Sequence, residues 1–370
     1  MSDLFSQEIY FDNSDDAHEY ARENPGVTIV RHEARDGYKI KTEESNEPVR
    51  VKKIKIDSTK TPNGILKHLN KHVISQAEAK REIALAMYYH YLKVTHGKKN
   101  ELKNNGPLML VGSTGTGKTF IVQKVCEYMD ILFIHVDASS MVPDGIVGYS
   151  LGDLAKDILS KANNNLYKAM HCVVFFDEAD KLMTSQYGRK VINQLLKLIE
   201  GTQIKKPYGS SDTVTELDSS NMQFIFGGAF QWILDEKSKT KTQVGFAQQE
   251  RQEIQTPEIT LDDLYADGLS KELLGRIGTI VNLTPLTEDD YYNILTKSES
   301  SPLKKFVTKI EFHGDKVKIP DETLRSIAKM CTQSQLGVRA INQILKTLFK
   351  EALFIAPEGE CKTHHIRFDS

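Results

Sequence analysis

Eight consecutive residues have the types and spacing of a loop that binds phosphate. They are Gly112-Ser113-Thr114-Gly115-Thr116-Gly117-Lys118-Thr119, which fits the pattern GxxxxGK(S/T). Glycines let backbone N–H groups turn inward around a phosphate, and the start of a following helix adds partial positive charge. In this pattern the lysine reaches the β- and γ-phosphates, and the threonine hydroxyl joins the shell of a Mg²⁺ ion. The loop therefore predicts a site for ATP and Mg²⁺.

Two carboxylates follow an apolar run further along the chain. Residues 173–176 are Val-Val-Phe-Phe, and Asp177 and Glu178 come directly after them. Taken alone, this could be a solvated strand end. After a phosphate-binding loop, with one apolar run between the two, it is typical of a metal-binding strand. We expect Asp177 to support Mg²⁺ and Glu178 to orient and polarise the attacking water, because phosphoryl transfer depends mainly on positioning and charge neutralisation.

The segments around these residues alternate between short apolar runs and helical patterns. The helical patterns cover residues 64–71, 76–94, 118–128, 154–162 and 191–200, and the apolar runs cover residues 108–111, 132–136, 173–176, 224–226 and 279–283. Fully apolar strands that alternate with helices are typical of a parallel sheet covered on both faces. The sequence therefore predicts an α/β fold, with the phosphate-binding loop directly after the first of these strands.

The two ends of the chain have different patterns. Residues 1–60 predict a short β/α appendage, with a helix at 13–24, strands at 27–30 and 38–41 joined by a turn at Asp36-Gly37, and a polar linker at 42–47. After about residue 286 helical patterns dominate, at 288–296, 321–330 and 338–353, before a late strand at 365–368. We expect three parts: an appendage (1–60), a large ATPase domain (61–284) and a small, mainly helical domain (285–370).

Composition excludes several classes of protein. The chain has 370 residues, 48 Lys and Arg and 50 Asp and Glu, so its formal net charge of −2 excludes a generally basic coat for nucleic acid. Its four cysteines form no CxxC pair, which argues against a disulfide framework or a cysteine-based zinc site. The N-terminus has no apolar run, and the longest weakly polar stretch, 222–234, is too short to span a bilayer. We therefore expect a cytoplasmic protein that does not contact the membrane.

Several blocks of sequence, taken in order, resemble the AAA+ ATPases and, within the Clp/Hsp100 group, the ClpX protein unfoldases. The resemblance covers residues 61–368, and its blocks are Val73-Ile74-Ser75-Gln76 with Ala79-Lys80, Lys197 to Thr202, Gly227 to Phe230, Leu274-Gly275-Arg276 and Gly337-Val338-Arg339. The Cys-rich zinc-binding domain with which ClpX usually begins has no counterpart in residues 1–60. Knowledge of adaptors therefore does not carry over from the family.

The resemblance implies roles at the nucleotide. Val73 and Ile74 would pack on adenine, and Arg276 would be an arginine finger that reaches the γ-phosphate held by a neighbouring subunit. Arg339 would be the sensor-2 arginine, which couples the nucleotide to rotation between the two domains. An isolated Arg is more often an ordinary surface residue, and only the surrounding blocks favour these roles. The first sensor stays unassigned, because the run 224–226 leads into Gly227-Gly228 without a polar side chain.

The resemblance also implies loops that act on polypeptide. Residues 145–148 resemble an axial pore loop, but the family's gripping aromatic is replaced by Ile146; the candidate gripping residues are Ile146, Val147, Gly148 and Tyr149. Residues 203–221 stand where ClpX has a second, basic pore loop, and offer only Lys205 and Lys206. Val244-Gly245-Phe246 resembles the tripeptide that docks ClpX on the ClpP peptidase. An apolar anchor repeated around a ring suits multivalent docking.

Three functions are therefore open. The first is a homo-oligomeric, six-membered protein unfoldase that feeds protein substrates to a ClpP-like peptidase. The second is the same motor acting as a remodeller of complexes without a peptidase, with residues 1–60 choosing targets. The third is a nucleotide-switched scaffold or a DNA-acting AAA+ protein, supported only by basic clusters at 52–55, 96–103 and 237–241. Such clusters are usually solvated faces, so we expect no nucleic-acid partner.

Overall fold

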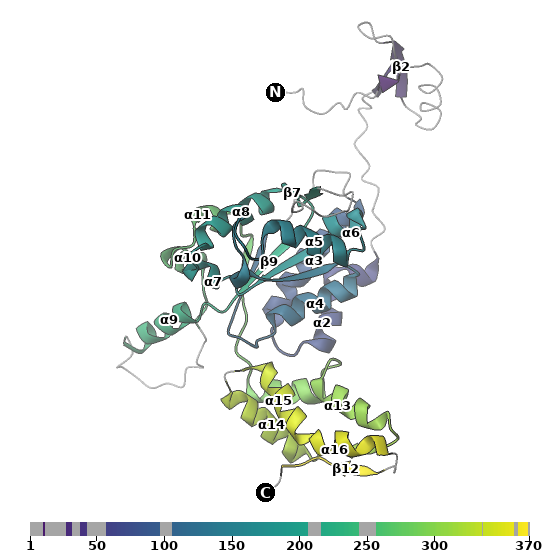
Figure 1. Ribbon diagram of the computed structural model, residues 1–370, viewed down its shortest axis with the longest axis vertical. Coiled ribbons are helices and arrows are strands. Elements are labelled where there is room, and N and C mark those ends of the chain that lie inside the picture. The colour runs from purple at the N-terminus through teal and green to yellow at the C-terminus, as the bar shows by residue number, and fades with distance from the viewer. Residues whose placement is uncertain are drawn as a thin grey trace. The chain divides into compact units, whose positions relative to one another are not determined.

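The computed structural model describes residues 10–11, 27–31, 38–42, 57–96, 106–205, 216–243, 257–334, 336–358 and 362–368. The chain divides into two compact units, Met1–Lys55 and Ile56–Ser370 (Figure 1).

The first unit contains a small antiparallel sheet. Its strands β1 (Tyr10–Phe11), β2 (Val27–Arg31) and β3 (Tyr38–Thr42) pair in the order β1-β3-β2. The two strands predicted here are confirmed, and β1 was not predicted. The predicted helix at 13–24 and the turn at Asp36-Gly37 lie outside the described residues.

The second unit is built on a five-stranded parallel sheet. Its order is β10-β4-β9-β6-β5, and its strands are β4 (Leu108–Val111), β5 (Phe133–Asp137), β6 (Val173–Asp177), β9 (Gln223–Gly228) and β10 (Thr279–Asn282). All five strands predicted from apolar runs are confirmed. Each run is apolar throughout because both faces of a parallel sheet are buried.

Two hydrophobic cores lie on opposite faces of this sheet. Leu108 and Leu110 of β4 belong to one core, and Met109 and Val111 to the other, as the alternation along a strand requires. The first core is covered by α2 (Pro62–His72), α3 (Ala77–His96) and α4 (Lys118–Met129). The second is covered by α5 (Leu151–Lys161), α6 (Leu166–Met170), α7 (Lys181–Thr184), α8 (Gly188–Glu200), α9 (Gln231–Gln243), α10 (Leu261–Ala266) and α11 (Lys271–Leu274) (Figure 1).

A third core lies within the C-terminal helices. These are α12 (Glu288–Thr296), α13 (Pro302–Glu311), α14 (Asp321–Gln333), α15 (Val338–Leu348) and α16 (Lys350–Ile355), with the parallel strands β11 (Lys316–Lys318) and β12 (Thr363–His365). The start of α12 is fixed by a capping box, in which Thr287 accepts from the N–H of Asp290 and the Asp290 carboxylate accepts from the N–H of Thr287.

Two predictions for this part are wrong in detail. The single helix expected at 338–353 is two helices that meet at Phe349, whose fully buried ring packs against Phe306. The strand expected at 365–368 lies at Thr363–His365 instead, where it pairs with the three residues of β11. The next residue, Ile366, donates its N–H to the carbonyl of Lys318 at 2.9 Å, and its side chain is buried in the core. Both shifts depend on tertiary partners that a local pattern does not contain.

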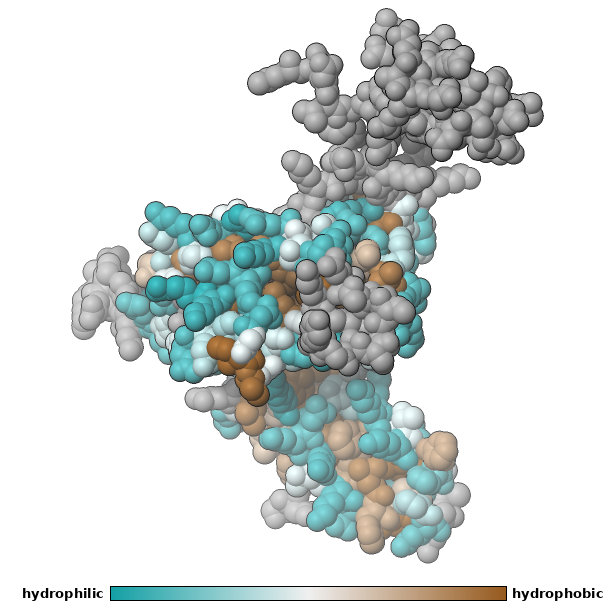
Figure 2. Space-filling model, turned by 45° about the horizontal axis from the view of Figure 1, so that its top comes forward, coloured by the Kyte–Doolittle hydropathy of each residue, from teal (hydrophilic) through white to brown (hydrophobic). Residues whose placement is uncertain are grey.

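Figure 2 shows one face of the molecule, which is largely hydrophilic over the sheet domain and carries more apolar side chains over the C-terminal helices. Among the helices of the described ranges, none combines the length and apolar character that crossing a membrane requires.

One titratable side chain is buried in the sheet domain without a charged partner. His90 of α3 is 1% exposed, and its Nε2 donates to the carbonyl oxygen of His171 at 3.0 Å. Its Nδ1 has no hydrogen-bond partner in the part of the chain that the structure describes. Burial lowers the pKa of His90 to about 4, so this ring is neutral in the native protein at neutral pH.

We expect His90 to make the protein less stable as the pH falls. An unfolded histidine takes up a proton near pH 6.5, whereas native His90 resists protonation until about pH 4. The contribution of neutral His90 to the free energy of unfolding is therefore fully present above about pH 6.5 and decreases as the pH falls toward about 4. At pH 5 about 2 kcal/mol of it is lost. The free energy of unfolding is measured in urea at pH 7 and at pH 5. Its decrease between the two pH values should be about 2 kcal/mol smaller for His90→Gln than for the wild type. The exposed His313→Gln is the control, and equal losses in all three proteins would contradict the prediction.

Candidate functional site

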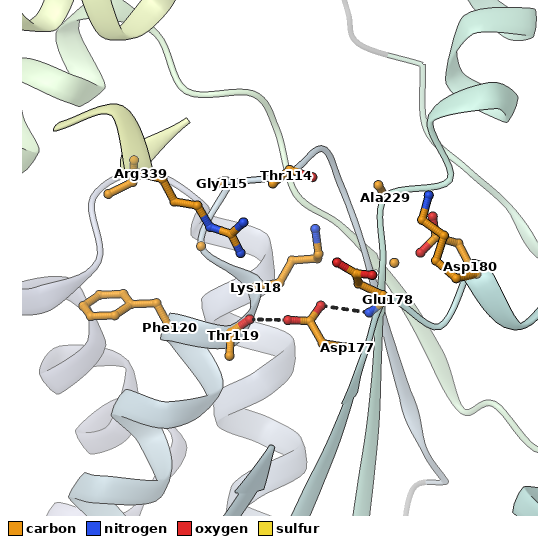
Figure 3. A pocket seen from close by; sticks show the side chains of 14 residues that line it. Thr114, Gly115, Lys118, Thr119, Phe120, Asp177, Glu178, Asp180, Ala229 and Arg339 are labelled. Atoms are coloured by element: carbon orange, nitrogen blue, oxygen red, sulfur yellow. Dashed lines mark hydrogen bonds between the residues drawn. The ribbon is translucent and has the colours of Figure 1, made fainter. Parts of the chain in front are cut away.

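The glycine-rich loop lies between the end of β4 and the start of α4. Gly115 and Gly117 have φ angles of +82° and +101°, in the left-handed region that favours glycine. Gly117 is the N-cap of α4, so the free N–H groups of that helix face the loop. A cavity of about 280 Å³ opens here (Figure 3), and it is lined by Thr114, Gly115, Gly117, Lys118, Thr119, Phe120, Asp177, Glu178, Asp180, Lys181, Gly228, Ala229, Val338 and Arg339.

Lys118 places a buried cation at the floor of the cavity. The side chain donates from Nζ to the carbonyl oxygens of Gly112 at 2.6 Å and Ser113 at 3.2 Å. Burial lowers the pKa of Lys118, and the nearby Asp177 carboxylate acts in the opposite direction. An ammonium group that is held by carbonyls of its own loop can exchange them for phosphate oxygens.

Thr119 and Asp177 meet at the side of the cavity. The Thr119 hydroxyl donates to Asp177 Oδ2 at 2.9 Å, and His135 Nε2 lies 3.2 Å from the same oxygen. Burial alone would raise the pKa of Asp177, but the hydrogen bonds from His135, Thr119 and the N–H of Glu178 hold it below its usual value. A hydroxyl and an ionised carboxylate in contact are oxygen donors of the kind that Mg²⁺ takes. The residues present therefore fit this ion.

Glu178 occupies an uncommon backbone conformation beside Asp177. Its φ is +55°, and its N–H donates to Asp177 Oδ1 at 3.0 Å. Such a conformation costs roughly 1–3 kcal/mol and persists only when the surroundings enforce it. The N–H of the next residue, Ala179, donates to the carbonyl of Gly227 at the end of β9 and fixes this turn. The turn leaves the exposed Glu178 carboxylate at the cavity wall (Figure 3).

Asp180 is a lining residue that was not predicted from the sequence. It is 2% exposed, and its carboxylate accepts from the N–H of Phe230 at 3.4 Å, just beyond the end of β9. The signal was present, since an acidic residue follows Asp177-Glu178 after one alanine. At the unassigned first sensor position, Gly228 and Ala229 line the cavity with little side chain. At Gly227 a Cβ would come within 2.5 Å of the Phe175 ring.

The C-terminal helices close the cavity on its remaining side. Gly337 precedes α15 with a φ of +59°, and its backbone lies directly on that of Gly115. A Cβ on either glycine would come within 2.7 Å of the other residue's backbone. This contact of two bare backbones lets Arg339 of α15 extend over the loop toward Lys118 (Figure 3).

A second cavity of about 220 Å³ lies on the other side of the loop. It shares Gly117, Phe120 and Val338 with the first, and its other lining residues are His72, Val73, Ile74, Thr116, Leu286, Ile294, Ser298, Ser300, Pro302, Lys305 and Asn342. The structure thus places Val73 and Ile74 in an apolar wall next to the loop. A polar cavity joined to a partly apolar one can hold a phosphate chain and an aromatic base.

Arg276 stands apart from this arrangement. Within the described ranges it lines neither cavity, and its guanidinium pairs with Glu200 at the end of α8. It also donates from Nη1 to the carbonyl of Glu272 at 3.0 Å. Its side chain is partly exposed, so it can meet a group from another molecule.

The candidate pore loop presents one fully exposed apolar side chain. Val147 is 101% exposed, Ile146 is half-buried and Gly148 has a φ of +149°. Tyr149 folds back instead: its hydroxyl donates to Asp157 at 2.9 Å, and its ring packs against the core. Burial, with this hydrogen bond to the carboxylate, raises the pKa of Tyr149.

Two other predicted loops are described in part or not at all. The second pore-loop segment begins as β7 (Gln203–Lys205) and returns as β8 (Glu216–Asp218), an antiparallel pair, and residues 206–215 between them lie outside the described residues. The tripeptide Val244-Gly245-Phe246 also lies outside them.

Two comparisons with known proteins both find similarity to proteins that bind ATP or belong to an ATPase family. Residues 108–239 match the family described as ATPase family associated with various cellular activities (AAA). The chain is similar to three curated proteins named as ATP-binding subunits ClpX of ATP-dependent Clp proteases. Identity is 27% over 322 residues for Treponema denticola (80% of this chain, 77% of the relative) and 29% over 314 residues for ClpX 2 of Wolinella succinogenes (81% and 78%). It is 28% over 350 residues for Porphyromonas gingivalis (88% and 83%).

Proposed function

Because the chain is an AAA+ ATPase similar to ClpX, we propose that it is a protein unfoldase that threads polypeptide through the axial pore of a six-membered ring. ATP hydrolysis itself follows from the AAA domain and the named relatives. The observation that carries the proposal is the cavity at the glycine-rich loop, where side chains from the sheet domain and from α15 face one ligand volume. A motor requires its nucleotide site to touch the parts that move.

In this proposal the loop and α4 bind the phosphates of ATP. Backbone N–H groups of residues 112–117 and Lys118 hold the phosphate oxygens, and Val73 and Ile74 pack on the base. Thr119 and Asp177 hold Mg²⁺, which neutralises charge on the phosphates when bound. Glu178 orients the attacking water through its carboxylate, and Arg339 binds the same phosphate chain from α15.

In the proposed ring, a neighbouring subunit supplies a further positive charge to each nucleotide site. Each Arg276 would reach the γ-phosphate held by the neighbouring subunit and stabilise charge in the transition state. Among the described residues Arg276 lines neither cavity of its own chain, and this position and its partial exposure support the role. Hydrolysis would then require two protomers, which makes the homo-oligomer part of the active site.

Polypeptide would be moved by the exposed loop at 145–149. Val147 and Ile146 supply apolar contact area that can grip a chain by burial, though less than an aromatic side chain would supply. With Tyr149 folded back, Val147 is the best candidate for first contact.

We further propose that Val244-Gly245-Phe246 docks a ClpP-like peptidase, since the similar relatives are named as subunits of Clp proteases. Residues 61–284 and 285–370 would act as the large and small domains of a cytoplasmic motor. Protein substrates are its proposed partners, and neither a membrane nor nucleic acid is among them.

The experiment measures both steps on one substrate. A stable fluorescent protein with an unstructured tag is incubated with the wild type and ATP, first alone and then with ClpP. We expect fluorescence to fall only with ATP, and fragments to appear only with ClpP. Deletion of residues 244–246 should abolish fragments and leave unfolding intact. Fragments that persist after the deletion would refute docking through the tripeptide, and no ATP-dependent unfolding of this or other tagged substrates would refute the unfoldase itself.

A further inference from the structure

The connection between α2 and α3, residues 73–76, contains two strained residues in succession. Ser75 and Gln76 have φ angles of 58° and 57°, in the left-handed region that residues other than glycine rarely adopt. Each such residue costs about 1–3 kcal/mol, and the conformation persists only where the surroundings enforce it. Something specific must therefore hold this connection.

The side chain of Gln76 supplies one anchor. It is 5% exposed, and its amide makes two hydrogen bonds to the backbone of one distant residue, Thr284. Nε2 donates to the Thr284 carbonyl at 2.7 Å, and Oε1 accepts from the Thr284 N–H at 3.0 Å. Thr284 lies just after β10, where the chain leaves the sheet for the C-terminal helices.

A second set of hydrogen bonds anchors the other end of the connection. At the end of α2, the carbonyl of Lys71 accepts from the N–H of Glu299 at 2.9 Å, and that of His72 accepts from the Ser298 hydroxyl at 2.7 Å. The His72 ring lies 2.8 Å from the Ser300 hydroxyl. All three partners belong to the link between α12 and α13.

The residues between the two anchors line the base-side cavity. Val73 and Ile74 form part of its wall, and the buried Lys80 fixes the carbonyl of Val73 at 3.1 Å. Leu286, two residues after Thr284, lines the same cavity from the other side. A base placed there would contact both the anchored connection and the segment that leaves the sheet.

We propose that Gln76 is a positioning residue that couples occupancy of the base-side cavity to the segment at Thr284, and through it to the orientation of the C-terminal helices. The proposal rests on the proposed nucleotide site. A ligand shifts a conformational equilibrium only by contacts that differ between the two states. The paired bonds of Gln76 provide the mechanical link, since a displacement of Gln76 must be shared by Thr284 or must break hydrogen bonds of a buried amide.

The test separates nucleotide binding from its consequence. Spin labels at Lys156→Cys in α5 and Lys329→Cys in α14, both exposed in the wild type, report the distance between the sheet domain and the C-terminal helices. The ligand is ATPγS, and its affinity is measured by calorimetry. We expect a change of the label distance in the wild type on binding. Gln76→Ala should bind ATPγS within about threefold of the wild type and lose at least half of that change.

Three further variants keep the test decisive. Ser75→Gly relieves strain but keeps both bonds, so it should retain the full change, as should the exposed Gln343→Ala. Gln76→Glu has the same size but loses the donor to the Thr284 carbonyl, so it should lose the change even if the alanine variant does not fold. A full change in a folded Gln76 variant, or no change in a wild type that binds ATPγS, would overturn the inference. A wild type that does not bind ATPγS would overturn the proposed site instead.

Discussion

Glu178→Gln is expected to reduce the ATP turnover number by at least about a hundredfold, the usual range for loss of a positioned general base. The glutamine side chain can occupy the same position. The hydrogen bond that holds this turn runs from the backbone N–H of residue 178 to the Asp177 carboxylate, so it does not depend on the side chain of residue 178. It cannot accept a proton from water. The loop, Lys118 and the contact between Thr119 and Asp177 stay intact, so affinity for ATP should remain within about threefold.

The measurement is steady-state turnover with a separate equilibrium titration of ATP. Glu311→Gln, an exposed carboxylate at the end of α13, is the matched control and should behave as the wild type. A Glu178→Gln variant that hydrolyses ATP at the normal rate would exclude this residue as the group that orients water. Loss of ATP affinity with normal turnover would assign it to binding instead.

Arg276→Ala should reduce turnover by about a thousandfold, the lower range measured when an arginine finger is removed. Because Arg276 lines neither of the two cavities found in the described part of its own chain, ATP affinity per protomer should stay near that of the wild type. Arg276→Lys should recover only part of the rate, because an ammonium lacks the planar fork of donors that a guanidinium presents to phosphate.

The control for a merely electrostatic effect is another exposed arginine with a carboxylate partner. Arg325 pairs with Asp321 at 3.0 Å on α14, and Arg325→Ala should leave turnover unchanged. Normal turnover in Arg276→Ala would remove the neighbouring subunit from the reaction. A selective loss of ATP affinity would show that Arg276 serves ground-state binding.

The sheet and its loop were predictable because their signals are local. A strand buried on both faces must be apolar at every position, and a loop that wraps phosphate needs glycine where φ is positive, as at Gly115 and Gly117. The helix start at α12 is local for the same reason, since Thr287 and Asp290 cap it within one turn.

The remaining features depend on contacts between distant segments. The backbone contact between Gly337 and Gly115 and the hydrogen bonds between Gln76 and Thr284 each join parts of the chain that are far apart in sequence. The hydrophobic periodicity of the sequence does not predict such pairs. Tyr149 illustrates the same limit: its residue type suits a gripping loop, but its hydroxyl is held by Asp157 of α5.

The most direct test of the account mixes two inactive proteins. Glu178→Gln lacks the group that orients water but keeps Arg276, whereas Arg276→Ala has the opposite defect. If one chain binds the triphosphate and its neighbour completes the reaction, mixed rings contain interfaces with both groups intact. ATP turnover should then rise well above the sum of the separate proteins and peak near equal amounts. Turnover that never exceeds that sum, in rings shown to exchange subunits, would contradict a shared active site.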